Sequence, residues 1–162
     1  MVVALGCNLP GAYTSREALL EAAVCALAGE GMAVVGRSGW WTSAAWPDPT
    51  GPAYLNGVVL VETALAPAET LAALHRVEAA FGRARAERNA ARTLDLDLIA
   101  HGRTAADGDL VLPHPRAHER LFVMGPLAEV APGWTHPVLG RTATELAAGA
   151  TVGTDARPLP HP

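Results

Sequence analysis

The sequence predicts an α+β fold of the split βαβ type, an antiparallel sheet with helices packed on its faces. Apolar patterns along the chain follow the order strand, helix, strand, strand, helix, strand, which is the order of that fold. The chain has 162 residues, 50% hydrophobic and 17% charged, which is enough for one buried core and too apolar for a disordered protein. We therefore expect a single domain over residues 1–150 and a loosely ordered C-terminal tail over 151–162.

Local patterns predict each element in turn. Runs rich in apolar and β-branched residues predict the strands, at residues 2–5, 32–35 with 40–42, 54–62 and 93–100. The first helix begins at the capping-box pair Thr14 and Glu17 and ends at Gly29. The second runs from Pro67 to a stop at Gly82. A proline-containing loop is expected at 44–53, a hairpin turn at 107–108, and short helices around 120–130 and 144–148.

Charge and composition exclude several classes of protein. Twelve basic and sixteen acidic residues give a net charge of −4, which argues against a polybasic membrane binder or a protein that coats nucleic acid. The sequence has no lysine, so a lysine-containing phosphate loop and Schiff-base chemistry are both excluded. No apolar run approaches the ~20 residues of a membrane span and no export signal is present, so we expect a cytoplasmic protein with Cys7 and Cys25 as buried thiols.

The sharpest chemical signal is a pair of aspartates in a predicted strand, within Arg92-Thr93-Leu94-Asp95-Leu96-Asp97-Leu98. Because side chains alternate along a strand, Asp95 and Asp97 share the face opposite the leucines, with Cα atoms roughly 6–7 Å apart. Aspartate is a poor strand former, and paired carboxylates suit a divalent cation such as Mg²⁺. The alternative is an exposed polar strand face without a ligand.

Cationic residues flank this pair. Upstream lie five of the twelve arginines: Arg76, Arg83, Arg85, Arg88 and Arg92. Guanidinium groups grip phosphate oxygens two at a time, so carboxylates beside arginines predict a site for a metal-bound polyphosphate. The alternative is a solvated loop with salt bridges to Glu78 and Glu87. Downstream, His114, Arg116, His118 and Arg120 form a second cationic stretch, in which a proline directly after His114 excludes a zinc-peptidase motif.

Five segments carry a family resemblance, in order: Leu5-Gly6-Cys7-Asn8-Leu9; Tyr54-Leu55-Asn56; Glu78 with Gly82-Arg83-Ala84-Arg85; Arg92 to Asp97; and Pro113-His114 with Arg120-Leu121-Phe122. Together they resemble the hydroxymethyldihydropterin pyrophosphokinases of folate biosynthesis, over about residues 2–134. The resemblance implies a ferredoxin-like fold and transfer of the diphosphate of ATP to the hydroxymethyl group of the pterin, with release of AMP.

The resemblance also implies roles for individual residues. Asp95 and Asp97 would ligate two Mg²⁺ ions that bridge the triphosphate, and they would act as catalytic residues with Arg83 and Arg92. ATP contacts are implied for Arg85, Arg92, His114 and Arg120, with His75 as a weaker candidate. The pterin would contact Gly6, Ser43, Tyr54, Asn56 and Phe122. The implied partners are ATP and a small pterin, with no nucleic acid, no membrane and a monomeric chain.

Three positions depart from the family pattern: Cys7 replaces a serine, Asn89 stands in place of a loop tryptophan that covers the pterin, and Pro115 replaces a tyrosine. The residues alone leave two other functions open. A nucleotide cyclase or polymerase-like enzyme can carry paired aspartates on a similar sheet, although it does not need the His114 to Phe122 segment. A non-catalytic ferredoxin-like module that binds a small molecule or RNA would leave the aspartates solvated, although acidic residues on the sheet face disfavour RNA.

Overall fold

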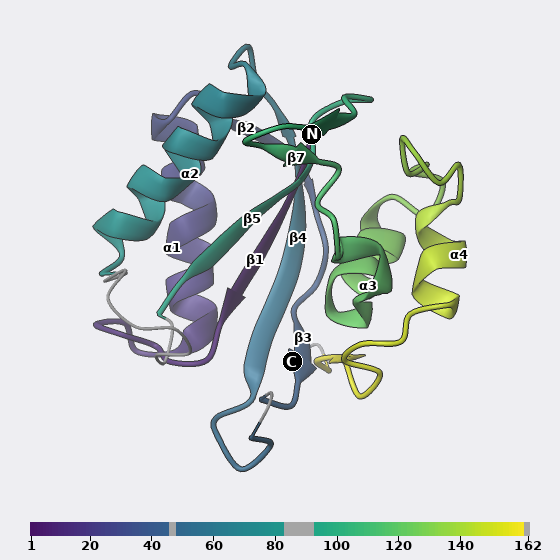
Figure 1. The fold of residues 1–162 in the computed structure, drawn as a ribbon. Helices are drawn as coiled ribbons and strands as arrows, with labels where there is room; N and C mark the ends of the chain where they lie inside the picture. Colours follow the sequence, from purple (N-terminus) through teal and green to yellow (C-terminus); the bar gives the residue numbers. More distant parts are fainter. Residues whose placement is uncertain (46–47, 83–92, 161–162) are drawn as a thin grey trace.

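A computed structural model describes residues 1–45, 48–82 and 93–160, and its centre is a six-stranded sheet (Figure 1). The strands are β1 (Val2–Cys7), β2 (Ala33–Arg37), β3 (Trp41–Ser43), β4 (Tyr54–Glu62), β5 (Asp95–Ala100) and β8 (Arg157–Pro158). Their order is β5-β1-β4-β3-β8, with β2 also paired to β4, and every pairing is antiparallel. The predicted antiparallel sheet is therefore confirmed.

Helices cover both faces of this sheet. Helices α1 (Arg16–Gly29) and α2 (Pro67–Ala80) lie on one face, and α3 (Leu121–Val130) and α4 (Ala143–Ala148) lie on the other (Figure 1). A hairpin of β6 (Ala106–Asp107) and β7 (Val111–Leu112) and a short 3₁₀ helix (Ala117–Glu119) connect β5 to α3. Within the part of the chain that the structure describes, no helix has the length and apolar character needed to cross a membrane.

The sheet separates two buried cores, because side chains alternate along each strand. On β1, Val3 and Leu5 pack in the core under α1 and α2, whereas Val2 and Ala4 pack in the core under α3 and α4. On β5, Leu96 and Leu98 belong to the first core. Asp95 and Asp97 alternate with these leucines, so both carboxylates project on the α3 side of the sheet, together on one face as predicted.

Two local predictions in the first helix are wrong. The N-cap is Ser15, whose Oγ accepts the N–H of Ala18 at 3.1 Å, so the helix begins one residue later than the Thr14 and Glu17 pattern indicates. Cys7 is buried, but Cys25 is exposed. Cys25 lies two positions from the buried Ala23 and Leu27, which turns it about 200° away from the core side of the helix.

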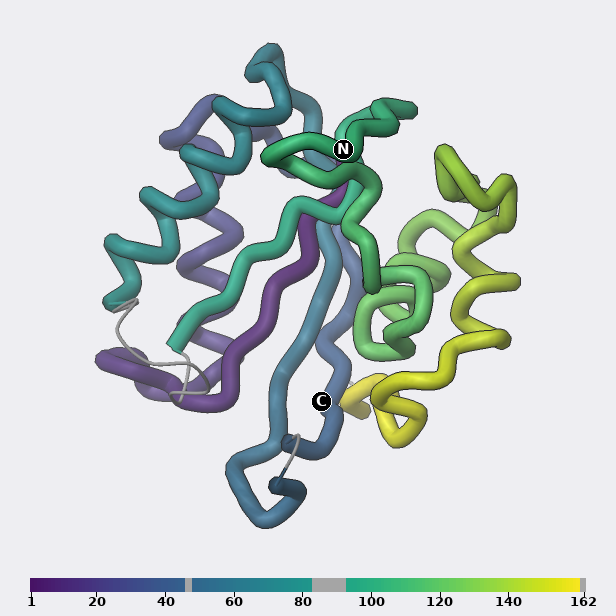
Figure 2. Tube along the Cα trace, in the orientation of Figure 1, coloured from purple at the N-terminus to yellow at the C-terminus, as the bar shows by residue number. Residues whose placement is uncertain are grey.

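The C-terminal segment also differs from expectation. Residues 151–160 were expected to lie in a loosely ordered tail, yet β8 pairs with β3 and the N–H of Leu159 donates to the carbonyl of Trp40 at 2.8 Å. Ala156 is buried in the same stretch. A two-residue strand is too short to give an alternating pattern, so only the pairing with a distant segment defines it. Figure 2 shows this yellow end of the chain beside the blue β3.

Candidate active site

Polar residues expected to form a site lie in one row across the sheet. The strand register places Asp95 of β5 opposite Gly6 of β1, Gly6 opposite Asn56 of β4, and Asn56 opposite Trp41 of β3. Residues that lie opposite one another project on the same face, and neighbouring strands are about 4.8 Å apart, so the row spans about 15 Å. Four segments that are distant in sequence therefore meet on the α3 side of the sheet.

Asn56 has a fixed orientation near the middle of this row. Its side chain is buried, and Nδ2 donates to Ser43 Oγ at 3.0 Å. Its Oδ1 faces Gly6, because a Cβ at Gly6 would lie 3.4 Å from that oxygen. Tyr54 lies opposite Ser43 on the same face of β4 and β3. Four of the five predicted pterin contacts, Gly6, Ser43, Tyr54 and Asn56, are therefore brought together.

Asp95 and Asp97 lie at the β5 end of the row. Their opposite residues on β1 are Gly6 and Ala4, which carry little or no side chain in front of the carboxylates. Among the described residues, no three His, Cys, Asp or Glu side chains are grouped closely enough to hold a metal ion. A cation bound to this aspartate pair would therefore need further oxygen ligands, which the phosphates of a nucleotide can supply.

His114 reaches this end of the site from the loop after β7. Its backbone N–H donates to the carbonyl of Ile99 at 2.8 Å, which attaches the loop to β5. Its Nδ1 accepts the N–H of Arg116 at 3.2 Å, so Nε2 carries the proton of the neutral ring. Burial lowers the pKa of His114, the carboxylates of Asp97 and Asp95 raise it, and the charge of Arg120 lowers it. The imidazole is thus close enough to both aspartates to feel their charge.

Arg120 and Phe122 lie at the start of α3. The Arg120 guanidinium lies over the Phe122 ring, with Cζ 5.7 Å from the ring centroid. One turn later on the same helix, Gly125 packs directly on Trp41, because a Cβ at Gly125 would lie 2.6 Å from the indole. This close packing attaches α3 to the β3 end of the polar row and brings Phe122 to the face of the sheet that carries Asn56.

Four predicted phosphate-binding arginines, Arg83, Arg85, Arg88 and Arg92, lie outside the described residues, as does Asn89, and their roles stay predictions. The residues on either side of that segment are described. Phe81 stacks on Tyr13 with ring centroids 5.7 Å apart, and Thr93 lies against Gly11. Both flanks therefore lie beside the turn that follows β1, which is the end of the sheet where Asp95 lies.

Residues of α2 that the sequence groups with the phosphate-binding stretch have different surroundings in the structure. Arg76 was expected among the phosphate-binding arginines, but it is exposed and pairs with Glu30 at the end of α1, with Nη2 and Oε2 2.7 Å apart. Glu78 is buried instead of lying on the surface, and its Oε1 accepts the N–H of Leu96 on β5 at 2.7 Å. His75 is half-buried on the same helix, and its contact with ATP stays a prediction.

The hydrogen bonds that hold β3 against the helices are not apparent from the sequence. The Trp41 indole donates to Glu129 of α3 at 2.8 Å, and the same carboxylate accepts the N–H of Gly39 at 2.7 Å. On the other face of the sheet, the Trp40 indole donates to Glu21 of α1 at 3.2 Å. Alternation along a strand predicts that adjacent tryptophans face opposite ways. No local pattern in the sequence identifies Glu129 as the partner of Trp41, because the two residues are 88 positions apart.

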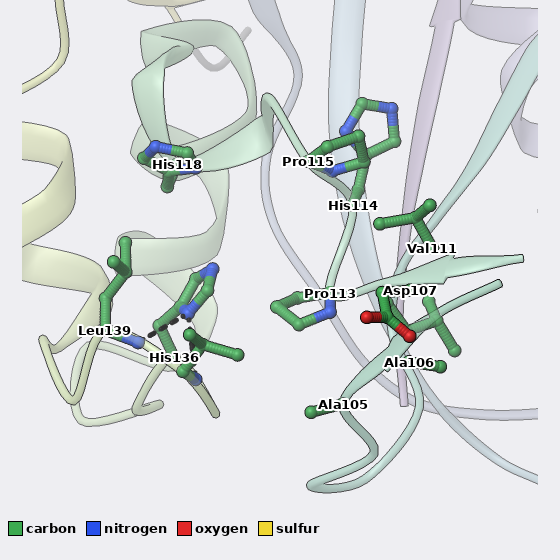
Figure 3. A pocket seen from close by; sticks show the side chains of 12 residues that line it. Ala105, Ala106, Asp107, Val111, Pro113, His114, Pro115, His118, His136 and Leu139 are labelled. Carbon is green, nitrogen blue, oxygen red and sulfur yellow. Dashed lines mark hydrogen bonds between the residues drawn. The ribbon is translucent and has the colours of Figure 1, made fainter.

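A groove of about 460 Å³ opens beside His114, between the β6–β7 hairpin and the loop after α3 (Figure 3). His118 and His136 lie on one wall, and Pro113 and Asp107 lie on the other (Figure 3). Neither Asp95 nor Asp97 lines this groove. The groove therefore borders the candidate site through His114 but does not include its carboxylates.

His136 of this groove makes stability depend on pH. Its Nδ1 accepts the N–H groups of Val138 and Leu139 at 3.2 and 3.1 Å, and burial lowers its pKa, with a further lowering by His118. A histidine whose pKa is lower in the folded state contributes stability above its ordinary pKa of 6.5 and loses it as the pH falls. We expect the free energy of unfolding to decrease between pH 7.5 and about pH 5.5 more in the wild type than in His136→Asn, whose amide oxygen replaces the acceptor.

Denaturant titrations of both proteins at the two pH values measure this difference. Titrating groups that do not interact with His136 contribute equally to both proteins and cancel, whereas the contact between His118 and His136 is part of the difference that is measured. An identical pH dependence for the two proteins would show that His136 is not the responsible group.

The fold and the site together indicate a class of enzyme. The antiparallel α+β sheet is of the ferredoxin-like class, and its paired carboxylates, imidazole and guanidinium at one end, with an amide and aromatic rings beside them, are the groups expected in an enzyme of that class that binds a phosphorylated nucleotide. Comparison with known proteins narrows this class to one family. Residues 2–132 match the family described as 7,8-dihydro-6-hydroxymethylpterin-pyrophosphokinase (HPPK). The chain belongs to this family, whose reaction in folate synthesis is pyrophosphoryl transfer from ATP to hydroxymethyldihydropterin.

Individual relatives agree with the family match. The 2-amino-4-hydroxy-6-hydroxymethyldihydropteridine pyrophosphokinase of Synechocystis sp. is 42% identical over 147 residues, which cover 90% of this chain and 73% of the relative. The enzyme of the same name from Bacillus subtilis is 36% identical over 133 residues, 79% of this chain and 75% of the relative. The crystal structure of Plasmodium falciparum HPPK-DHPS with pteroate aligns with a TM-score of 0.69 at 12% identity, over 91% of this chain and 41% of that one. This last likeness supports the fold.

Proposed function

We propose that the polar row and the residues at its β5 end form the site of pyrophosphoryl transfer, with the pterin at Asn56 and the ATP triphosphate at Asp95 and Asp97. The observation that supports this assignment is the register that places Asp95, Gly6 and Asn56 side by side on one face. In the reaction, the pterin hydroxyl oxygen forms a bond to the β-phosphorus of ATP while the bond from that phosphorus to the AMP oxygen breaks; AMP leaves with that electron pair, and the hydroxyl proton is released to solvent. Both reactants must therefore lie close together, and Asp95 and Asn56 are two strands apart in this row, a distance of about 10 Å.

The carboxylate pair fits Mg²⁺. Two oxygen-ligand side chains on one strand face, with no bulky residue opposite, leave room for hard cations that also take phosphate oxygens as ligands. Asp95 and Asp97 would hold two such ions, which supply charge neutralisation for the triphosphate when bound. The aspartates themselves fix where the triphosphate lies relative to Asn56.

The pterin end of the row suits a flat heterocycle with polar edges. The Nδ2 of Asn56 is engaged by Ser43, so the amide cannot rotate freely, and its Oδ1 faces the small Gly6. A fixed amide oxygen selects a ligand that donates a hydrogen bond at that position. Tyr54 and Phe122 offer aromatic faces on the same side of the sheet, and stacking on such rings adds about 0.5–1.5 kcal/mol beyond buried area.

Cationic groups hold the phosphates. Arg120 lies next to His114, whose neutral Nε2–H donates a hydrogen bond without adding charge. Arg83, Arg85, Arg92 and His75 complete the proposed set of ATP contacts. Because this kind of transfer depends mainly on positioning and charge stabilisation, these groups and the aspartates account for catalysis without a dedicated general base.

One coupled assay tests the proposed function. We expect AMP to form from ATP only when hydroxymethyldihydropterin and Mg²⁺ are both present, with one pterin diphosphate produced for each AMP. Formation of a cyclic nucleotide, or of diphosphate without pterin, would indicate a cyclase-like enzyme instead. Binding of pterin without turnover in the presence of ATP and Mg²⁺ would indicate a non-catalytic module.

A further inference from the structure

The segment 151–158, here called the C-terminal strap, is bonded to the backbone on both sides of Arg120. The N–H groups of Thr151 and Val152 donate to the carbonyl of Glu119 at 3.0 and 2.9 Å. The carbonyl of Val152 accepts the N–H of Leu121 at 2.9 Å. Arg120 and Val152 thus lie side by side as a parallel bridge, which fixes the start of α3.

The next strap residue packs on Phe122. Gly153 has a φ of +64°, and a Cβ at this position would overlap the Phe122 ring. Glycine is therefore required for two reasons, the left-handed backbone and the close approach of the ring. The backbone of the strap forms part of the surface on which Phe122 rests.

Two residues later the strap reaches the opposite side of the site. Asp155 Oδ2 accepts the N–H of Ala44, the residue after Ser43, at 2.5 Å. Arg157 and Pro158 then pair with Thr42 and Trp41 of β3 (Figure 2). The Cα atoms of Gly153 and Asp155 can be at most about 7 Å apart. One short stretch of chain therefore contacts both Phe122 and the end of β3 that presents Ser43.

We propose that the C-terminal strap sets the spacing between the two sides of the pterin site, with Gly153 and Asp155 as positioning residues. This inference rests on the proposed function, since it takes Phe122 and the Ser43–Asn56 pair as the two sides. Gly153 determines how closely α3 brings Phe122 to the sheet, and Asp155 holds the end of β3 so that Ser43 meets Asn56. The strap lies beyond residue 132, where the family match ends. The strap contacts the Phe122 ring and the end of β3 directly, but it meets Arg120 only through backbone hydrogen bonds on either side of that residue, so we expect its side chains to act mainly on the pterin.

Gly153→Ala tests the Phe122 contact, and Gly140→Ala is its matched control. Gly140 has a φ of +67°, almost that of Gly153, and no described atom lies within 4 Å of a Cβ built there. Both substitutions introduce the same backbone strain, but only the first displaces an aromatic ring. We expect Gly153→Ala to raise the KM for pterin about tenfold or more relative to Gly140→Ala, since small misplacements in a site have effects of that size. Calorimetry with a non-hydrolysable ATP analogue alone should show a smaller difference between the two variants, because the Phe122 ring meets the analogue only through the neighbouring Arg120.

Asp155 is tested by a graded pair of variants. Asp155→Ala removes the acceptor for Ala44, whereas Asp155→Asn keeps an oxygen at that position. We expect Asp155→Ala to raise the KM for pterin with little change in kcat, and Asp155→Asn to restore most of the wild-type KM. If Gly153→Ala does not fold, this pair carries the test by itself.

Two outcomes would overturn the proposal while leaving the proposed function intact. One is a pterin-active enzyme in which Gly153→Ala and Gly140→Ala have equal KM values. The other is a common loss of stability in Asp155→Ala and Asp155→Asn with the KM for pterin unchanged, which indicates a purely structural strap. A wild-type protein that forms no pterin-dependent AMP would instead refute the proposed function itself.

Discussion

Asp95→Ala and Asp97→Ala should each lower kcat/KM by about 10²- to 10³-fold, the loss found when one group that stabilises transition-state charge is removed. The two carboxylates share one face of β5 and lie opposite Gly6 and Ala4, so neither supports a packed side chain on β1. We expect the fold to persist, and the free energy of unfolding to stay constant or rise, because truncation relieves repulsion between neighbouring like charges. Steady-state kinetics at saturating Mg²⁺ measures the loss, and denaturant titration checks the fold.

Asp107→Ala is the control for this prediction. Asp107 is an exposed aspartate on β6 that lines the neighbouring groove, so the substitution removes one negative charge near the site without touching the β5 pair. It should leave kcat/KM within about twofold, as expected for a surface substitution. Near-wild-type turnover of either β5 variant at saturating Mg²⁺ would show that the pair does not hold the catalytic metal ions.

Asn56→Ala should weaken pterin binding by about 10²-fold or more while affecting the ATP analogue far less, since a site built around a hydrogen bond loses the contact and leaves its partners unpaired. The amide is buried and its Nδ2 bonds to Ser43, so truncation also leaves the buried Ser43 hydroxyl without this donor. Calorimetric titration with each ligand separates the two affinities.

Ser38→Ala provides a matched control for the loss of a buried polar group. Ser38 is buried, and its Oγ accepts the N–H of Val58 on the same strand as Asn56 at 3.0 Å. It lies near Gly57, which packs against Trp40 in the other core. Ser38→Ala should lower the free energy of unfolding by about 1–3 kcal/mol without altering pterin affinity. Equal losses for pterin and the ATP analogue in Asn56→Ala would indicate general misfolding or a misassigned pocket.

The sequence predicted those elements whose pattern is local. Strand β4 follows from a β-branched run and has the expected bounds, and helix α2 follows from Pro67 with an apolar stripe, begins at the expected residue and ends at Ala80, just before the predicted stop at Gly82. The shared face of Asp95 and Asp97 follows from alternation alone. By contrast, the cap of α1 was misplaced by one residue, because Thr14 and Ser15 are both good caps and only the backbone geometry distinguishes them.

The remainder of the site depends on contacts between distant segments, which a periodicity argument cannot reveal. Arg76 lies near other arginines in sequence, yet its helical position directs it to Glu30. Gly153 and Asp155 lie in a stretch with no apolar period, and their importance comes from the neighbouring Phe122 and Ala44. In the sequence, Trp41 indicates only a strand, because its hydrogen bond to Glu129 depends on where α3 lies.

Trp40 and Trp41 are adjacent in sequence but lie on opposite faces of the sheet. Their fluorescence can therefore report separately on the core under α1 and α2 and on the core under α3 and α4. Trp40 packs toward α1 and bonds to Glu21, while Trp41 packs toward α3 and bonds to Glu129. A single-tryptophan form that keeps Trp40 reports the emission of one core, and a form that keeps Trp41 reports that of the other. If the sheet couples the layers into one cooperative unit, both fluorescence transitions coincide in a denaturant series. Quenching by a bound pterin should then be confined to the form that keeps Trp41, since that indole lies in the same row as Asn56.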